Sequence, residues 1–369
     1  MNHTKKLGDF LKQEAVLIIS TLLALLSTIA VPPDRRYLSY IDWHTLALLF
    51  SLMVVVSGLS EHQGLKAIAY RLIALTPHKR GRAFALVALS FFSSMLITND
   101  VALITFVPLT IITFTAGEDR SYLLYTIILE TVAANVGSAL TPVGNPQNLF
   151  LYNHYSLNFL TMATAMAPYV GGGALLLLVL LAFIPKKREE GETAHPPQVD
   201  VDSREIMRYS ALFVLAILAV FRVVPVFIAL AAIILLSEKR LLKSVDYSLL
   251  ATFVALFVLV GNLGRLEMIE AIISAYLEGR EFLLALILSQ IVSNVPATLL
   301  LAQFSDNAIE LLRGVNAGGC GTLIASMASV ISFRFYVKSE PGRAFTYLLL
   351  FTLVNILFII LFITIHTLF

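Results

Sequence analysis

Two stretches decide the fold of this chain: NVGSALTPVGNPQN at residues 135–148 and NAGGCGT at residues 316–322. Both lie inside long apolar runs, and each interrupts a helix there. Pro146 lacks an N–H and would clash with the preceding turn, and the glycines of the second stretch loosen its backbone. Because hydrocarbon offers no hydrogen bonds, a broken backbone at this depth must be buried in protein or line a wet cavity.

The composition predicts that the rest of the chain is embedded in a lipid bilayer. Hydrophobic residues make up 58% of it and charged residues 14%, whereas a soluble protein carries about 25% charged residues. The net charge of +2 is too small for a nucleic-acid binder, so no nucleic-acid partner is expected. The single cysteine excludes a disulfide framework and a CxxC-type metal site. The sequence therefore predicts an all-α polytopic membrane protein.

Apolar runs of about 20 residues predict the membrane spans. Hairpins that re-enter the membrane are expected at 83–115 and 282–303, and two short helices within 209–237, where Arg222 and Pro225 break the run. With a cytoplasmic N-terminus, this arrangement places twenty of the 26 Lys and Arg residues inside, as the positive-inside rule requires. We therefore expect nine spans, with the N-terminus inside and the C-terminus outside. Two of them are the short helices within 209–237, and the other seven, continuous or broken, lie near 15–31, 43–60, 122–152, 160–184, 247–263, 314–336 and 344–367.

The two halves of the chain repeat each other. Asp42 and Asp246 each open an apolar span, and a charged stretch, a hairpin and a broken helix follow in both halves. The two broken helices align at an offset of 181 residues. Because Asp42 is expected outside and Asp246 inside, the repeats are predicted to be inverted, as in many secondary transporters. The predicted division is a first repeat at 1–185, a cytoplasmic linker at 186–208 and a second repeat at 209–369.

The hairpin tips and the helix breaks are expected to form one polar cavity near the membrane midplane. Each break exposes a helix N-terminus suited to an anion and carbonyl oxygens suited to a cation. The alternative is that the small residues only let helices pack closely. The predicted solute- and ion-binding residues are Thr98, Asn99, Asp100, Asn135, Gly137, Thr141, Gly144, Asn145, Asn148, Ser293, Asn294, Asn316, Gly318, Thr322 and Ser326.

Two carboxyls lie deep in apolar sequence, Asp100 at the first tip and Glu130 before the first break. An ionisable group costs several kcal/mol there unless it is paired, solvated or protonated, so both are predicted to carry the coupling ion. The alternative is a neutral carboxyl bonded to a neighbouring helix. Arg222 is the only basic residue within an apolar run, and we expect it near the outer interface. No catalytic pair is visible, so no enzyme activity is expected.

These paired tips and breaks resemble the ion transporter superfamily over residues 40–335. That group includes divalent-anion/sodium symporters, citrate–metal transporters, arsenite efflux permeases and sodium/proton antiporters of the NhaD type. Dicarboxylate members carry Ser-Asn-Thr tips that help to bind sodium and the substrate carboxylate. Here the third tip position is Asp100 in one half and Val295 in the other, which looks more like the arsenite and citrate–metal branches.

The resemblance implies a secondary active transporter for a small anionic or oxyanion-type solute, coupled to protons or sodium. It also implies a mobile transport domain that moves like an elevator beside a scaffold, with homodimers in some branches. A sodium/proton antiporter is the alternative. No cofactor is expected apart from a bound sodium ion, and the expected location is the cytoplasmic membrane of a bacterium or archaeon.

Overall fold

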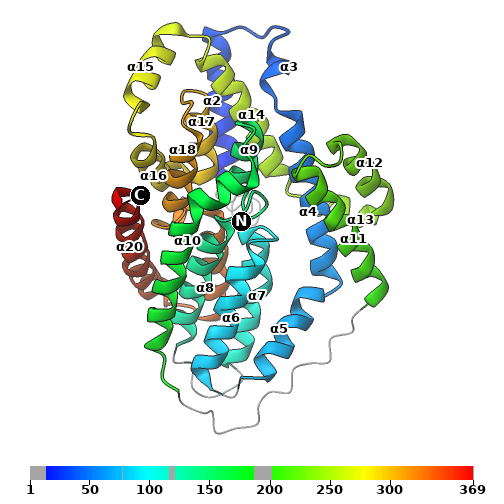
Figure 1. Ribbon diagram of the computed structural model, residues 1–369, viewed down its shortest axis with the longest axis vertical. Coiled ribbons are helices and arrows are strands. Elements are labelled where there is room, and N and C mark those ends of the chain that lie inside the picture. The colour runs from blue at the N-terminus through cyan, green and yellow to red at the C-terminus, as the bar shows by residue number, and fades with distance from the viewer. Residues whose placement is uncertain (1–13, 77, 116–119, 121, 187–201, 369) are drawn as a thin grey trace, which may run out of the picture.

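The computed structural model describes residues 14–76, 78–115, 120, 122–186 and 202–368, and this part of the chain is helical without any strand (Figure 1). The first half contains α2 (Ala15–Ala30), α3 (Tyr37–Tyr40), α4 (Trp43–Glu61), α5 (Gly64–Ala74), α6 (Lys79–Ser93), α7 (Asn99–Thr115), α8 (Leu123–Ser138), α9 (Pro146–His154) and α10 (Phe159–Ala182). Most of the predicted linker, residues 187–201, lies outside the described residues.

The second half follows this order with one additional helix near its start and a 3₁₀ turn within its broken helix. It contains α11 (Ser203–Val220), α12 (Val226–Leu236), α13 (Lys239–Leu242), α14 (Tyr247–Leu263), α15 (Glu267–Leu277), α16 (Glu281–Val292), α17 (Asn294–Ala302), α18 (Ala308–Gly318), the 3₁₀ turn η1 (Leu323–Ala325), α19 (Met327–Ser339) and α20 (Ala344–Leu368). Stretch 209–237 is two helices, as expected, with Arg222 in the left-handed region between them. The second broken helix starts at Ala308, earlier than predicted, because Asn307 caps it through Glu310 N at 3.3 Å.

Equivalent aspartates begin the corresponding helices α4 and α14. The Asp42 carboxylate accepts a hydrogen bond from Thr45 N at 2.9 Å, and that of Asp246 accepts one from Leu249 N at 2.9 Å. An N-cap of this kind satisfies one of the backbone donors that a helix leaves free at its start. The sequence match between the two halves therefore corresponds to the same local structure.

Three helices of the described residues are long and apolar enough to cross a membrane on their own: α4, α10 and α20. A fourth qualifies if α14 and α15, which meet at 103°, are counted as one bent span. Several others, including α2, α7, α8, α12 and α16, are apolar but shorter. Short apolar helices are what breaks and hairpins within the membrane produce, and the count of nine spans stays a prediction.

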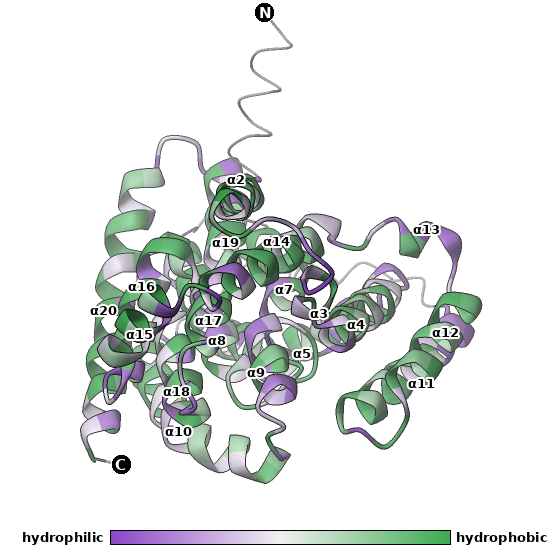
Figure 2. Cartoon of the chain, turned by 90° about the horizontal axis from the view of Figure 1, so that it is seen from above, coloured by the Kyte–Doolittle hydropathy of each residue, from purple (hydrophilic) through white to green (hydrophobic). Residues whose placement is uncertain are grey.

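The helices pack in two groups (Figures 1 and 2). In the first, which we name the α4 group, α11, α12 and α13 pack on α4, while α2 and α3 pack on α14. In the second, the α8 group, both hairpins and both broken helices pack together with α10 and α20. The α4 group touches the α8 group through α9 and α17, which begin at the break of the first half and the tip of the second.

Within the α4 group, each half of the chain packs on the other. Helix α2 lies against α14 and α11 lies against α4. Near the ends of α4 and α14 a glycine makes room for a tyrosine of the opposite half: a Cβ on Gly58 would meet the Tyr209 ring at 2.3 Å, and one on Gly261 the Tyr40 ring at 2.4 Å. Each half of the chain therefore supplies a glycine against which a tyrosine of the other half packs.

The outer helices expose apolar side chains. Leu353, Ile356 and Ile360 of α20 are 45–57% exposed, and α2 presents a similar face. Exposed apolar surface on this scale is rare on a soluble monomer and is the ordinary surface of a protein in lipid. The fold thus agrees with the helical membrane protein that the composition predicted.

Candidate functional site

The first broken helix ends α8 at Ser138 and resumes as α9 at Pro146. Proline suits the first position of a helix because no N–H is needed there. Between them the chain folds back tightly, since a Cβ on Gly144 would lie 2.2 Å from the Ser138 carbonyl oxygen. Asn148 holds this turn by donating from Nδ2 to the carbonyls of Ser138 and Thr141, at 3.1 and 3.2 Å.

The first hairpin tip is bound directly to this break. Asn99 donates from its backbone N to Gly144 O at 3.1 Å and from Nδ2 to Asn135 Oδ1 at 2.9 Å. Thr141 Oγ1 donates to Met95 O at 2.5 Å, and Thr98 begins the next helix by accepting from Ala102 N. The tip and break of the first half are therefore hydrogen-bonded into one structure.

The second half makes the same junction with different residues. Ser293 separates α16 from α17 with φ of 77° and donates to Ala325 O at 3.3 Å. Gln290 donates to Gly318 O at 2.8 Å and accepts from Thr322 N at 2.8 Å. Sequence reasoning missed Gln290, although an amide one turn before a tip in an otherwise apolar helix was a usable signal.

The two halves then join through asparagines and a serine. Asn135 Oδ1 also accepts from Ser326 Oγ at 3.0 Å, and Asn135 Nδ2 donates to Gly319 O at 3.2 Å. Asn316 Nδ2 donates to Asn148 Oδ1 at 2.7 Å. We call the buried set Asn99, Asn135, Asn148, Asn316 and Ser326 the asparagine cluster.

Asn294 and Asn145 lie beside the asparagine cluster. A Cβ on Gly319 would lie 3.1 Å from Asn294 Nδ2, and Asn145 Nδ2 donates to Ser138 Oγ at 2.8 Å. The oxygens Asn145 Oδ1 and Asn316 Oδ1 are buried without a hydrogen-bond partner. Buried acceptors of this kind are costly unless a donor or a cation reaches them. They are therefore unpartnered acceptors beside the asparagine cluster.

The asparagine cluster is closed in this structure. Asn135 and Asn316 line a void of about 10 Å³ with Met166 and Tyr169, room for about one water molecule. A larger cavity of about 640 Å³ lies beyond the far ends of α9 and α17. Its polar lining includes Arg36, Arg265, Asp42, His154 and Gln303. A solute in the larger cavity would therefore reach the asparagine cluster only if α9 and α17 moved.

The predicted coupling carboxyls have different surroundings. Asp100 lies in the first turn of α7, its N–H donates to Asn99 Oδ1 at 2.9 Å, and its Oδ1 is buried without a partner. Glu130 is completely buried in α8 and accepts from Thr110 Oγ1 at 2.8 Å. Asp100 belongs to the tip, whereas Glu130 bonds α8 to α7 away from it.

Gly137 and Gly318 let helices approach closely beside the site. A Cβ on Gly137 would lie 2.1 Å from Phe91 O, and one on Gly318 would lie 2.7 Å from Ser289 Cβ. Their role in this structure is the packing role that small residues have in membrane helices.

Gly137→Ala is expected to lower the apparent Tm, because α6 must move away from α8 at a cost of about 1–3 kcal/mol. Thermal unfolding of the purified protein measures this. Gly171→Ala is the matched control, since a Cβ there meets nothing within 4 Å. Equal Tm values for the two variants would contradict the close packing.

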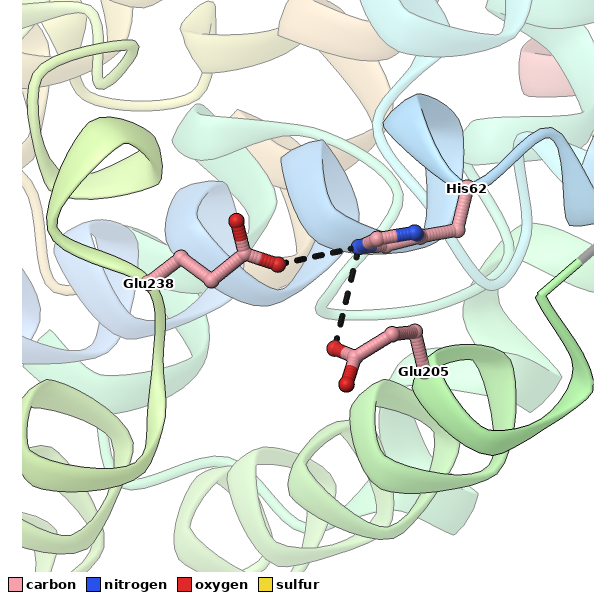
Figure 3. Close-up of side chains that lie close together, drawn as sticks. All are labelled: His62, Glu205 and Glu238. Carbon is pink, nitrogen blue, oxygen red and sulfur yellow. Dashed lines mark hydrogen bonds and ion pairs between the residues drawn. The ribbon is translucent and has the colours of Figure 1, made fainter.

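A second polar cluster lies at the end of α4, in the α4 group (Figure 3). His62 Nε2 is 3.2 Å from Glu238 Oε1 and 3.8 Å from Glu205 Oε2, a donor set that could hold a metal ion. However, a guanidinium nitrogen of Arg208 lies 2.5 Å from the same Glu205 oxygen and 3.5 Å from the same Glu238 oxygen. The cluster therefore forms an ion-pair network that joins α4 to α11 and to the start of α13.

This network predicts a pH-dependent stability. A hydrogen bond from Arg240, at 2.5 Å, holds the pKa of Glu238 below its ordinary value of 4.5. A lowered pKa in the folded state stabilises the protein above the ordinary value, and the contribution is lost as the pH falls through the folded value. Glu238→Gln should therefore lower the apparent Tm at neutral pH and have no effect in acid. Glu278→Gln, at an exposed carboxyl, is the control, and a pH-independent difference would contradict the argument.

The arrangement of exposed apolar helices around a buried polar junction defines an integral membrane protein. Comparison with known sequences adds the family: the model of the citrate transporter family matches residues 10–312. The chain belongs to this family of secondary transporters.

Individual relatives agree with that membership. A Methanocaldococcus jannaschii protein described as an uncharacterized transporter is 36% identical, over 85% of this chain and 86% of its own length. The inner membrane protein YbiR of Escherichia coli is 32% identical over 80% of each chain. A Dictyostelium discoideum transporter named arsB is 27% identical over 40% of this chain and 26% of its own. The family and the first of these relatives are described as transporters, and the chain is a transporter of this family.

Proposed function

We propose that this transporter moves a small anionic or oxyanion-type solute by alternating access, coupled to protons or sodium. The asparagine cluster carries this proposal, because it joins the first tip and both breaks at one buried place, with Asn294 of the second tip beside it. Helices α9 and α17 begin beside it at Pro146 and Asn294, so their N-terminal partial positive charges favour an anion there. The family name, citrate transporter, supports an anionic cargo.

The unpartnered oxygens support a coupling cation near the solute. Asn145 Oδ1, Asn316 Oδ1 and Asp100 Oδ1 are acceptors without a donor, and such oxygens suit a bound sodium ion. Without a cation, a proton on Asp100 would neutralise that carboxyl. The predicted tip and break residues would then be ligands of the solute or of this ion.

The α8 group is our candidate for the moving part of an elevator, and the α4 group for its scaffold. The contact between them through α9 and α17 and the cavity at the far ends of those helices fit such a division. Inverted repeats, a homodimer and the cytoplasmic membrane as location belong to the same proposal. YbiR, described as an inner membrane protein, supports the location.

The test is uptake by purified protein in liposomes. Citrate, arsenite and sulfate are offered separately under an imposed proton or sodium gradient, and gradient-dependent accumulation of one of them is expected. If none of these solutes moves under any gradient, the proposal is wrong.

A sodium/proton antiporter is the second candidate, favoured by the carboxyls Asp100 and Glu130 and by the absence of a basic residue from the asparagine cluster. A sodium pulse applied to acid-loaded vesicles would then change the fluorescence of an internal pH dye without any solute. No response to sodium would remove this candidate.

A further inference from the structure

The larger cavity, at the far ends of α9 and α17, is a second polar site that lies apart from the asparagine cluster. Its volume of about 640 Å³ lies within the range of sites for small molecules. Residues 36–42 and the ends of α9, α14 and α17 surround it. Phe150 of α9 and Phe257 of α14, with ring centroids 5.8 Å apart, supply part of an apolar wall. An apolar wall with a few polar groups is the usual lining of a ligand site.

Arg265 presents unused donors to this cavity. Its Nη1 donates to Asp34 Oδ2 at 2.9 Å and to Tyr40 Oη at 3.1 Å, which holds the guanidinium in place. In the part of the chain that the structure describes, Arg265 Nε and Nη2 have no acceptor. These two nitrogens form one edge of the guanidinium, and their parallel N–H groups match two oxygens of a carboxylate or of a tetrahedral oxyanion. The side chain is 32% exposed, so an anion in the cavity can reach this edge.

Two further polar side chains of the lining have unused donors. The Arg36 guanidinium makes no hydrogen bond or ion pair with any described residue, although the Arg36 backbone N–H donates to Asp34. The Gln303 amide also has no hydrogen bond among the described residues. It lies beside Gly264, where a Cβ would be 3.5 Å from Gln303 Nε2. Both side chains can therefore turn donors towards a bound anion.

The two carboxylates of this region are already bonded. Asp34 accepts from Arg265 and from the backbone N–H of Arg36. Asp42 uses both of its oxygens at the start of α4, where Oδ1 accepts from Thr45 N at 2.9 Å and Oδ2 from Thr45 Oγ1 at 2.5 Å. Neither carboxylate occupies the Nε–Nη2 edge of Arg265, so both leave this edge open to a ligand.

We propose that this cavity binds an anion through a carboxylate or oxyanion group, which lies on the Nε–Nη2 edge of Arg265 and accepts further from Arg36 and Gln303. The cavity borders segments that the charge rule predicts on the outer side. It lies at the far ends of α9 and α17, whose other ends reach the asparagine cluster. The site would therefore capture an anion before the movement that opens the cluster. That this anion is the transported solute rests on the proposed function; the binding does not.

Chemical modification of arginines in the full chain, held in lipid nanodiscs, tests the binding. Phenylglyoxal is added with and without citrate or sulfate at constant ionic strength, and peptide mass spectrometry follows each arginine. An anion present at about ten times its dissociation constant should slow the modification of Arg265 by about tenfold, because only the free site reacts. Arg280, an exposed arginine outside the cavity, is the control in the same sample and should react at an unchanged rate. Equal rates at Arg265 with and without either anion would overturn the proposal.

The same measurement in Asn99→Ala separates the cavity from the asparagine cluster. Protection of Arg265 should be retained in this variant, because Asn99 does not line the cavity. If the protection disappears, the anion binds at the cluster and the proposal is wrong. Protection requires no transport, so a protected Arg265 in a protein that moves no solute would support this site and contradict the proposed function.

Arg265→Lys tests the guanidinium edge without relying on the reactivity of Arg265. Lysine keeps the positive charge and can pair with Asp34, but it lacks two parallel N–H groups. Isothermal titration calorimetry is carried out in the Asn99→Ala background, so that the cavity alone is measured. The dissociation constant of citrate or sulfate should rise by about tenfold or more, as expected for hydrogen bonds to a charged group. Arg280→Lys is the matched control, and equal dissociation constants for the two variants would overturn the assignment of Arg265.

Discussion

Alanine at Asn99 or at Asn294 is expected to reduce solute uptake to background while the protein still folds. Asn99→Ala removes the donor to Asn135 Oδ1 and leaves that buried oxygen with Ser326 alone. Loss of a buried hydrogen-bond partner costs about 1–3 kcal/mol, equivalent to about 5- to 150-fold in ligand affinity. Asn294 holds the equivalent tip, beside Gly319.

Uptake into liposomes at equal protein content measures this effect, and size-exclusion chromatography reports on folding. Asn153→Ala is the matched control: it removes the same amide from α9, where Asn153 Nδ2 donates to Leu149 O outside the asparagine cluster. The control should transport normally. Wild-type uptake by both tip variants would mean that the tips have only a structural role.

Asp100→Asn is expected to separate solute movement from its driving gradient. Asparagine keeps the shape of the side chain and one oxygen that can accept a hydrogen bond, but it is permanently neutral. It can neither release a proton nor neutralise a sodium ion at the tip, where Asp100 Oδ1 is buried without a partner. Accumulation against a solute gradient should be lost, while exchange of labelled for unlabelled solute should continue in part.

The two modes are compared in the same vesicles, first with a proton or sodium gradient and then with solute on both sides and no gradient. Asp306→Asn, at an exposed carboxyl, should retain both. If Asp100→Asn still accumulates solute with unchanged pH dependence, Asp100 is a neutral hydrogen bonder and the coupling ion binds elsewhere.

Much of the site could be predicted from the sequence, because the residue types that produce its breaks, caps and tips act locally. Pro146 and the glycines around it cannot continue a helix wherever they lie, so the first break was predictable from residue types. Asp42 and Asp246 each cap a helix by accepting a hydrogen bond from the backbone N–H three residues further along. Both were recognised in the sequence as equivalent positions of the two halves. The hairpin tips were visible as polar residues between apolar runs.

The partners of these residues could not be predicted, because packing between distant segments selects them. Asn135 meets Ser326 across 191 residues, and Asn316 meets Asn148 across 168. Ser329, whose hydroxyl lies 3.5 Å from Asn135 Nδ2, is separated from Asn148 by the repeat offset of 181 residues. A single serine in an apolar stretch is too common to be predicted as a partner. Gln290 could have been noticed as an amide one turn before the tip, but its partners in the backbone of Gly318 and Thr322 could not have been predicted.

The sequence by itself determined that this is a helical membrane protein, where its helices break and which polar groups lie at the breaks. Hydrophobic length and backbone chemistry are properties of each segment, so they need no neighbours to act. Only the tertiary structure decided that Glu130 bonds to Thr110 of α7, away from the tip that carries Asp100. A helix has several faces and many possible neighbours, and the contact that forms depends on how all the apolar faces pack at once.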